Sequence, residues 1–334
     1  MSSHHRHCYT STPLARPTVI ITGTLICLLA VLLCSTAPAR TTGAMTPPTG
    51  SPAPSSGVAP AGDPAGETDA SITAVTFNIR YDTASDGVHA WPHRRDNLIE
   101  LVRSFDADLV GYQEVLQRQL DTLREAFEDE MTFLGVGRDD GETRGEFSPL
   151  AFRTDRFELI EWGTWWLSPT PDRPSRGWDA ALPRIATWAR LRDRSTDTAL
   201  LAVSTHFDHR GAEARLESAR LLVDKLADEP RVILLGDFNA RPNSPPHTTF
   251  TAAFTDAAGD DDRATWCGWS GQPQPGARID WILLRGYSAT RYDVPAWRNP
   301  EKPESDHLPV IATLTLSTDP PDAVPQHDDP PSDG

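Results

Sequence analysis

Apolar and polar residues alternate in several short stretches between residues 71 and 317, and this pattern predicts β-strands. Residues 71–79 show the alternation together with β-branched side chains, a combination typical of a strand. Other stretches are short apolar runs, as expected for strands that are buried on both faces. By these criteria further strands are predicted at 108–115, 131–136, 150–153, 158–168, 187–193, 198–207, 231–235, 279–284 and 308–316.

Three segments instead show apolar residues at helical spacing. Within 93–105, Leu98 and Leu101 begin an apolar face that recurs every three to four residues. The same spacing predicts helices at 117–127 and 213–226. Predicted strands therefore outnumber helices. This favours an α/β (α+β) protein in which one sheet packs on another and the helices lie outside.

The first 39 residues have the layout of a signal peptide. Arg6 and Arg16 precede the seventeen uncharged residues of 18–34, and Ala37 and Ala39 then form the small-residue pattern of a cleavage site. An uncleaved signal anchor is the alternative, because the apolar stretch is close in length to a membrane-spanning helix. Both alternatives predict that the rest of the chain is secreted or extracytoplasmic.

Two further segments lack the residues that form a core. Residues 40–70 contain six Pro and no aromatic residue, Ile or Leu, which predicts a flexible spacer. Residues 318–334 contain five Pro and five Asp, which predicts a disordered acidic tail. One folded domain, residues 71–317, remains. Nothing in its sequence implies an obligate protein partner, so we expect a monomer.

The charge and the cysteines exclude some classes of protein. The chain has 31 basic and 47 acidic residues, and its formal charge is −16. Nonspecific binding of nucleic acid needs a basic surface, so binding of long polyanions by bulk charge is disfavoured. Cys267 is the only one of four Cys beyond residue 34. This excludes a domain held by internal disulfides and a Cys-rich zinc site.

Polar clusters lie at the ends of six predicted strands. Each cluster alone is better explained as a turn or a helix cap. Together they contain carboxylates, amides and imidazoles, which favours one convergent pocket. The clusters are Asn78, Gln113-Glu114, residues 204–209, residues 236–239, residues 278–280 and residues 305–307.

The residue types in these clusters indicate metal-assisted hydrolysis. Oxygen donors without a nearby thiolate favour Mg²⁺, Mn²⁺ or Ca²⁺ over zinc. Histidines beside them could act as acids, bases or donors to developing charge, which suits the hydrolysis of phosphate esters. No P-loop, dinucleotide fingerprint, H-E-x-x-H or G-x-S-x-G motif is present. Nucleotide-triphosphate motors, NAD enzymes, zinc proteases and serine esterases are therefore disfavoured.

In their order and spacing, the six motifs resemble those of the endonuclease/exonuclease/phosphatase superfamily, which has the DNase I-like fold. The resemblance spans about residues 72–316 and implies a four-layer sandwich, with two central, mostly antiparallel β-sheets flanked by helices. The third motif is closer to the nocturnin, deadenylase, sphingomyelinase and inositol-phosphatase branches than to DNA-repair members, and other segments resemble a secreted bacterial subgroup. The motifs are 76–80 (TFNIR), 111–115 (GYQEV), 205–209 (THFDH), 236–239 (GDFN), 278–280 (RID) and 305–307 (SDH).

The resemblance implies roles for the residues that match its motifs. Glu114 corresponds to the principal ligand of Mg²⁺, for which Mn²⁺ is the alternative. Asn78 lies in the same metal shell, and Asp306 is a further carboxylate of the metal site. Asp237 corresponds to the group that positions or deprotonates the attacking water, and Asn239 to its phosphate-binding neighbour.

Four further residues complete the expected catalytic and phosphate-binding set. His307 corresponds to the imidazole that contacts the scissile phosphate, and Asp280 orients it. His206 corresponds to the second histidine, which donates to the phosphate. Arg184 is a candidate for gripping phosphate because a guanidinium suits bidentate contact, although an ordinary surface arginine is an equal alternative.

These observations predict a divalent-metal-dependent hydrolase of phosphoric esters. Whether it acts on diesters or monoesters stays open. The substrate is a nucleic acid, a phospholipid or sphingolipid headgroup, or a phosphorylated sugar or inositol. A catalytically dead binding module is the alternative from another class. The complete set of Glu114, Asp237 and His307 argues against it, because a dead copy is expected to have lost at least one of them.

Overall fold

The computed structural model describes residues 70–270, 272, 274–299 and 301–317. The expected signal peptide or anchor, residues 1–39, lies outside the described residues, as do residues 40–69 of the expected spacer and the expected tail at 318–334. Among the helices that are described, none has both the length and the apolar character that crossing a bilayer requires.

The described chain contains two six-stranded mixed sheets. In spatial order, the first sheet consists of β11 (Tyr287–Asp293), β12 (Val310–Leu316), β1 (Ile72–Asn78), β2 (Leu109–Gln113), β4 (Leu150–Arg153) and β3 (Met131–Leu134). The second consists of β5 (Phe157–Trp166), β6 (Ile185–Asp193), β7 (Thr198–His206), β8 (Val232–Asp237), β10 (Asp280–Arg285) and β9 (Thr255–Asp256).

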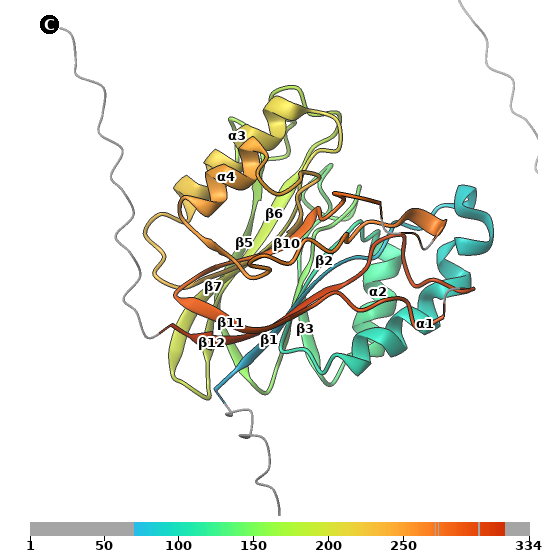
Figure 1. Ribbon diagram of the computed structural model, residues 1–334, viewed down its shortest axis with the longest axis horizontal. Helices are drawn as coiled ribbons and strands as arrows, with labels where there is room; N and C mark the ends of the chain where they lie inside the picture. Colours follow the sequence, from blue (N-terminus) through green and yellow to red (C-terminus); the bar gives the residue numbers. More distant parts are fainter. Residues whose placement is uncertain (1–69, 271, 273, 300, 318–334) are drawn as a thin grey trace, which may run out of the picture. The chain divides into compact units, whose positions relative to one another are not determined.

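Four longer helices cover the outer faces of the sheets. Helices α1 (Trp91–Ser104) and α2 (Gln117–Ala126) pack on the first sheet. Helices α3 (Ala212–Lys225) and α4 (Pro245–Thr251) lie against the second sheet, on the side away from α1 and α2 (Figure 1). Two short 3₁₀ helices, η1 (Ala84–His89) and η2 (Gly268–Ser270), lie in loops.

The alternation of side chains along each strand builds three hydrophobic layers. In β1, Ile72 and Ala74 face the layer between the two sheets, whereas Val75 and Phe77 face the layer under α1 and α2. Strand β8 divides its residues in the same way between the middle layer and the layer under α3 and α4. Successive side chains of a strand point to opposite faces, so both sheets are buried on two sides. The predicted four-layer sandwich is confirmed.

The predicted helices and strands all appear, with ends shifted by a few residues, but three elements were missed. Helix α4 is seven residues long and begins with Pro245 and Pro246, so it is too short to show a helical period. Strand β9 has two residues. Strand β11 lies at the edge of its sheet and only one of its residues is fully buried, so its sequence lacks the apolar pattern of a buried strand.

Parallel pairing brings four of the polar clusters to one end of the sandwich. Strands β1 and β2 are parallel, and Asn78 pairs with Gln113 at their carboxyl ends. Strands β7 and β8 are parallel in the other sheet, and His206 pairs with Asp237 at their ends. Most other strand pairs are antiparallel, as expected. The polar residues that follow these four strands therefore emerge on the same side.

Two antiparallel strands bring the remaining clusters to this end. Strand β10 runs opposite to β8, so its first residue, Asp280, pairs with Asp237, the last residue of β8. Strand β12 runs opposite to β1, and Thr76 pairs with Val310 near its start. Residues 305–307 therefore enter the sheet where β1 ends. All six motifs meet in this way.

The two sheets approach each other closely just below this end. A Cβ atom added at Gly111 would lie 2.7 Å from the Cβ atom of Leu235 on the facing sheet. Hydrogen bonds cross at the same level: the Ser204 hydroxyl donates to the Tyr112 carbonyl at 3.1 Å, and the Gln113 amide donates to that hydroxyl at 3.4 Å. Glycine at position 111 therefore sets the separation between the two halves of the site.

Candidate active site

Asn78 connects the two sheets at the centre of the site. Its buried Nδ2 donates to Oε1 of Glu114 at 3.1 Å and to Oδ2 of Asp237 at 2.9 Å. Its Oδ1 accepts the backbone N–H of Arg80 at 3.0 Å, which fixes the orientation of the amide. One side chain therefore sets the spacing between a carboxylate of the first sheet and a carboxylate of the second.

Glu114 follows β2 in a left-handed backbone conformation with φ of 61°. Such a conformation is uncommon for residues other than glycine and is often found at functional sites. The Glu114 Oε2 accepts the backbone N–H of Tyr81 at 3.2 Å and lies 3.8 Å from the guanidinium of Arg80. That guanidinium is already paired with Asp86 through two hydrogen bonds of 3.0 Å. The charge of Glu114 is thus only partly offset.

Asp237 lies between the two histidines. Its Oδ1 accepts the backbone N–H of Asn239 at 2.9 Å. Its Oδ2 lies 3.5 Å from Nε2 of His206 and 3.8 Å from Nε2 of His307. Burial and the neighbouring negative charge of Asp280 raise the pKa of Asp237 to about 7. A carboxylate with this pKa is suited to exchanging a proton near neutral pH.

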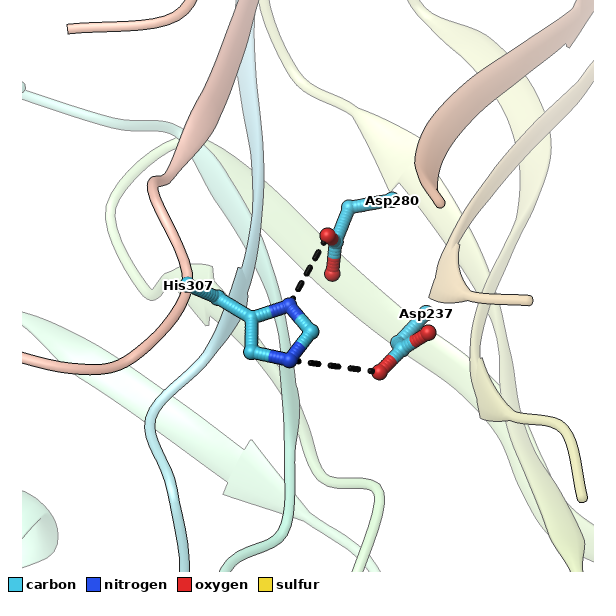
Figure 2. Close-up of side chains that lie close together, drawn as sticks. All are labelled: Asp237, Asp280 and His307. Carbon is cyan, nitrogen blue, oxygen red and sulfur yellow. Dashed lines mark hydrogen bonds and ion pairs between the residues drawn. The ribbon is translucent and has the colours of Figure 1, made fainter. Parts of the chain in front are cut away.

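Two carboxylates flank the ring of His307 (Figure 2). Its Nδ1 is 2.9 Å from Oδ2 of Asp280, and its Nε2 faces Asp237. Burial by itself lowers the pKa of His307, but the charges of Asp280 and Asp237 outweigh it and raise that pKa to about 10. His307 is therefore a cation at neutral pH, with Nε2–H available on the side of the site.

The hydroxyl of Thr265 holds Asp280 in place. It donates to Asp280 Oδ2 at 2.6 Å and accepts the backbone N–H groups of Ile279 and Asp280 at 3.0 and 3.1 Å. The sequence analysis did not identify Thr265, because a single threonine in a loop carries no pattern. Its position beside Asp280 depends on the fold.

Asn239 and His206 form a second hydrogen-bonded pair beside Asp237. Asn239 Nδ2 donates to the carbonyl of Phe207 at 3.1 Å and is 3.0 Å from Nε2 of His206. The carbonyl needs a donor, so the amide orientation is fixed and Nε2 of His206 is the acceptor. Burial and the charge of Arg184 lower the pKa of His206 well below its usual value. His206 is therefore neutral, with its proton on Nδ1.

Asp306 lies on the same side as Glu114. Burial raises the pKa of Asp306, and the negative charge of Glu114 adds to this effect. Asn78, Glu114 and Asp306 offer oxygen atoms from two carboxylates and an amide, with Arg80 already engaged by Asp86. A divalent cation is attracted to such a set, and oxygen ligands suit Mg²⁺ or Mn²⁺. These residues fit the metal that the motifs imply.

A second group, formed by Asp237, Asp280 and His307, could also hold a metal ion. One ligand atom from each lies within 4.8 Å of the others. However, the Nδ1 of His307 and the Oδ2 of Asp280 are already bonded to each other. A metal ion that bound either of these atoms would have to break this bond. The oxygen set around Glu114 therefore fits a metal ion better.

Arg184 lies on the far side of His206 and is buried, with 4% of its surface exposed. Its Nε donates to Asp208 at 3.4 Å, and its Nη2 is 3.0 Å from Nδ1 of His209. The alternative of a surface arginine is wrong, because the guanidinium is enclosed. Phosphate binding by Arg184 stays a prediction. Arg184 is surrounded by Arg138, Glu146, Ser148, Ile185 and His206, with no room for a bound molecule between them.

Glu146 is a site residue that the sequence analysis did not assign. Its carboxylate accepts two hydrogen bonds from Arg138, at 2.8 and 2.9 Å, and lies 4.0 Å from Nδ1 of His206. The neighbouring Phe147 pairs with Val115, which places Glu146 beside the strand that carries Glu114.

Arg94 on α1 joins three segments that border the site. Its buried guanidinium donates to the carbonyls of Ile79 at 2.5 Å and Arg80 at 2.6 Å. It also donates to the carbonyls of His89 at 2.9 Å and Glu304 at 2.8 Å. The loop after β1 donates a backbone N–H to Glu114. Arg94 therefore connects this loop to the segment that leads into His307.

Replacing Arg94 with Ala is expected to leave these buried carbonyls without a donor and to lower stability by about 2–5 kcal/mol. The rate of hydrolysis should fall as well, since both sides of the site lose a common support. Thermal unfolding and steady-state kinetics measure the two effects. Arg95→Ala is the matched control, because Arg95 is exposed and pairs only with its neighbour Asp96. Equal stability of the two variants would contradict this role.

Comparisons with known proteins agree with this site. Residues 75–307 match the Endonuclease/Exonuclease/phosphatase family. The endonuclease/exonuclease/phosphatase of Bacteroides vulgatus is 36% identical, with a TM-score of 0.71 over 74% of this chain and 99% of that one. The mannosyl-6-phosphatase of Bacteroides thetaiotaomicron is 31% identical, with a TM-score of 0.68 over 73% of this chain and 100% of that one.

More distant proteins are also similar. An uncharacterized protein of Acanthamoeba polyphaga mimivirus is 27% identical over 177 residues, which span 48% of this chain and 63% of that protein. The human nocturnin catalytic domain, at 17% identity, shares the fold with a TM-score of 0.58 over 74% of this chain and 94% of that one. The family match extends across all six motifs, from the strand that carries Asn78 to His307. The chain belongs to the endonuclease/exonuclease/phosphatase family.

Proposed function

We propose that this chain is a divalent-metal-dependent hydrolase of phosphate esters and that its substrates are small phosphorylated sugars. The observation that carries the proposal is the connection through Asn78. The carboxylates of Glu114 and Asp237 both accept hydrogen bonds from the Nδ2 atom of Asn78, and the His307 cation lies beside Asp237. This arrangement supplies ligands for a cation, a base for water and a positive charge for phosphate in one place.

Mg²⁺ or Mn²⁺ would be held by Glu114, Asn78 and Asp306. When bound, the ion offsets the negative charge of the phosphate and makes a bound water more acidic. The remaining steps are carried out by side chains on the other side of Asn78, beginning with Asp237. Asp237 accepts the proton of the attacking water at its Oδ2. Its neighbour Asn239 would have to release His206 or the Phe207 carbonyl before its amide could donate to the phosphate.

The His307 cation stabilises the charge that develops on the phosphate oxygens. Its Nε2–H donates to the ester, while the Nδ1 stays bonded to Asp280. Because Thr265 and the backbone hold Asp280, the imidazole needs little reorganisation during the reaction. The neutral His206 keeps Asn239 oriented, and its own donation to the phosphate would require Asn239 to turn away from Nε2.

Two observations favour a small sugar phosphate over the other substrate classes. A relative at 31% identity, aligned over its whole length, is a mannosyl-6-phosphatase. Residues 71–317 carry a formal charge of −11, which disfavours binding of long nucleic acids. Outside the cell, where we propose that this protein acts on the basis of the predicted signal segment, free phosphate esters are accessible substrates.

The structure offers little support for a lipid substrate. Strand β5 exposes Leu159, Ile160 and Trp162, which could contact a membrane. However, the end of β5 nearest the site is Trp166, which pairs with Ile185 at the start of β6. At about 3.3 Å per residue, Ile160 lies about 20 Å back along the strand. A lipid held there would not present its phosphate to Asp237.

Turnover by the full chain tests the proposal. We expect release of phosphate from mannose 6-phosphate in the presence of Mg²⁺ and loss of this activity in excess chelator. Inositol phosphates, RNA, plasmid DNA and sphingomyelin serve as competing substrates. An unchanged rate in chelator would contradict the metal requirement. Faster cleavage of RNA, DNA or sphingomyelin would contradict the sugar-phosphate assignment.

A further inference from the structure

Trp266 lies directly opposite His307 in a short antiparallel bridge outside the main sheets. The backbone N–H of Cys267 donates to the carbonyl of Asp306 at 3.1 Å, and that of Leu308 donates to the carbonyl of Thr265 at 2.7 Å. These bonds flank the pair, so Trp266 and His307 form a non-hydrogen-bonded pair. In such a pair the side chains lie on the same side and the Cα atoms are about 4.5 Å apart.

The two members of this pair differ in exposure. His307 is buried, with 4% of its surface exposed, whereas Trp266 is 38% exposed. Among the aromatic stacks and cation–π contacts of the described chain, none includes Trp266. A large, partly exposed aromatic ring therefore belongs to the residue paired with the catalytic histidine, and it has no aromatic or cationic partner among the described residues. Exposed aromatic surface beside a polar pocket is typical of a wall for ligand binding.

The loop that carries Trp266 is anchored on both sides. Before it, the Thr265 hydroxyl is bonded to Asp280 at 2.6 Å. After it, the ring of Trp269 stacks on His89, with 4.6 Å between ring centroids and 7° between the planes, and the Arg94 guanidinium lies 5.7 Å from the Trp269 ring. The position of Trp266 is thus fixed before any ligand binds, which reduces the entropic cost of stacking.

We propose that Trp266 determines specificity by stacking against the sugar ring of the phosphate ester that is hydrolysed. This inference rests on the proposed function and adds the part of the site that recognises the leaving group. A pyranose has an apolar face of C–H groups, and these groups pack favourably on the electron-rich face of an indole. The phosphate would lie at His307 and Asp237 while the ring of the sugar lies on Trp266.

Binding to the Asp237→Asn variant tests the stacking without turnover. We would measure the binding of mannose 6-phosphate, glycerol 3-phosphate and adenosine monophosphate by calorimetry in Mg²⁺. The measurements would compare the Asp237→Asn variant with the variant that also carries Trp266→Ala. The dissociation constant of mannose 6-phosphate is expected to rise about 10-fold or more. That of glycerol 3-phosphate, which has no ring, should change less than about 2-fold. Trp266→Phe should retain most of the binding because it keeps an aromatic face.

The matched control is Trp162→Ala in the same background, because Trp162 is 42% exposed on β5, away from the site. It is expected to change none of the three constants. If Trp266→Ala weakened the binding of mannose 6-phosphate and of glycerol 3-phosphate equally, the proposal would be overturned. Unchanged or undetectable binding of mannose 6-phosphate would also overturn it. Loss confined to adenosine monophosphate would overturn the sugar assignment. Failure of the proposed function is distinct, since it appears as absent turnover by the wild-type chain.

Discussion

Replacement of Asp237 by Asn is expected to lower kcat by a factor of about 10³ or more while leaving the fold intact. The carboxamide has nearly the same shape and can still accept the hydrogen bond of Asn78. It cannot take a proton from water. Because Asp237 is the carboxylate that lies between the two histidines, no neighbouring group replaces it. Steady-state kinetics with the preferred ester measures the loss.

The stability of this variant separates lost chemistry from lost structure. The pKa of Asp237 is raised from 3.8 to about 7, so the folded state holds its proton more tightly than the unfolded state does. Burying this charge therefore costs stability increasingly as pH rises from about 4 to 7, and the cost is fully present above pH 7. In chelator at pH 8, Asp237→Asn should unfold at the same temperature as the wild type or a higher one. Marked destabilisation would contradict this.

A matched carboxylate at the other end of the sandwich provides the control for activity. Asp193 ends β6, is buried and pairs with Arg156 at 3.0 Å. Asp193→Asn removes one negative charge from the interior, as Asp237→Asn does, but should retain nearly the wild-type kcat. If both variants lost activity equally, loss of a buried charge would explain the effect and the assignment of Asp237 as the base would be wrong.

Replacement of Glu114 by Gln is expected to raise the metal concentration needed for half-maximal activity by about 100-fold or more. Glutamine can accept the hydrogen bond of Asn78, yet it lacks the charge that attracts the cation. Titration of activity with Mg²⁺ and Mn²⁺ measures the shift. Glu130→Gln is the control, because Glu130 is exposed and pairs with Arg103.

The same titration distinguishes the two possible metal sites. If Asp280→Asn shifted the metal dependence as strongly as Glu114→Gln, the ion would lie with Asp237, Asp280 and His307 instead. We expect Asp280→Asn to reduce kcat mainly through the orientation and charge of His307, with a small change in metal dependence. A wild-type metal titration in Glu114→Gln would refute the assignment of Glu114.

The sequence predicted the fold and the membership of the central cluster because both depend on local patterns. Buried strands are short apolar runs, and each polar cluster directly follows or precedes such a run. Asn78, Glu114 and Asp237 could therefore be located before their contacts were known. The roles of these residues came from resemblance to a family, and the geometry now shows which of them touch.

The supporting residues escaped prediction because their contacts depend on the tertiary fold. Arg94 acts on backbone carbonyls up to 210 residues away, which leaves no trace in residue type. Thr265 is an isolated threonine in a loop, and its partner Asp280 is brought to it only by β10. The neutral state of His206 depends on the orientation of one amide, which no sequence pattern encodes.

The position of β12 has a consequence for how the chain folds. This strand is the last one in the described part of the chain, yet it lies inside the first sheet, between β11 and β1. The hydroxyl of Ser305, just ahead of it, donates to the carbonyl of Asn78 at 2.7 Å across 227 residues. Until β12 is made, β1 keeps an open edge and the pocket lacks His307. Pairing of such distant segments is slow. The catalytic centre therefore forms only after the two ends of the described chain have paired with each other.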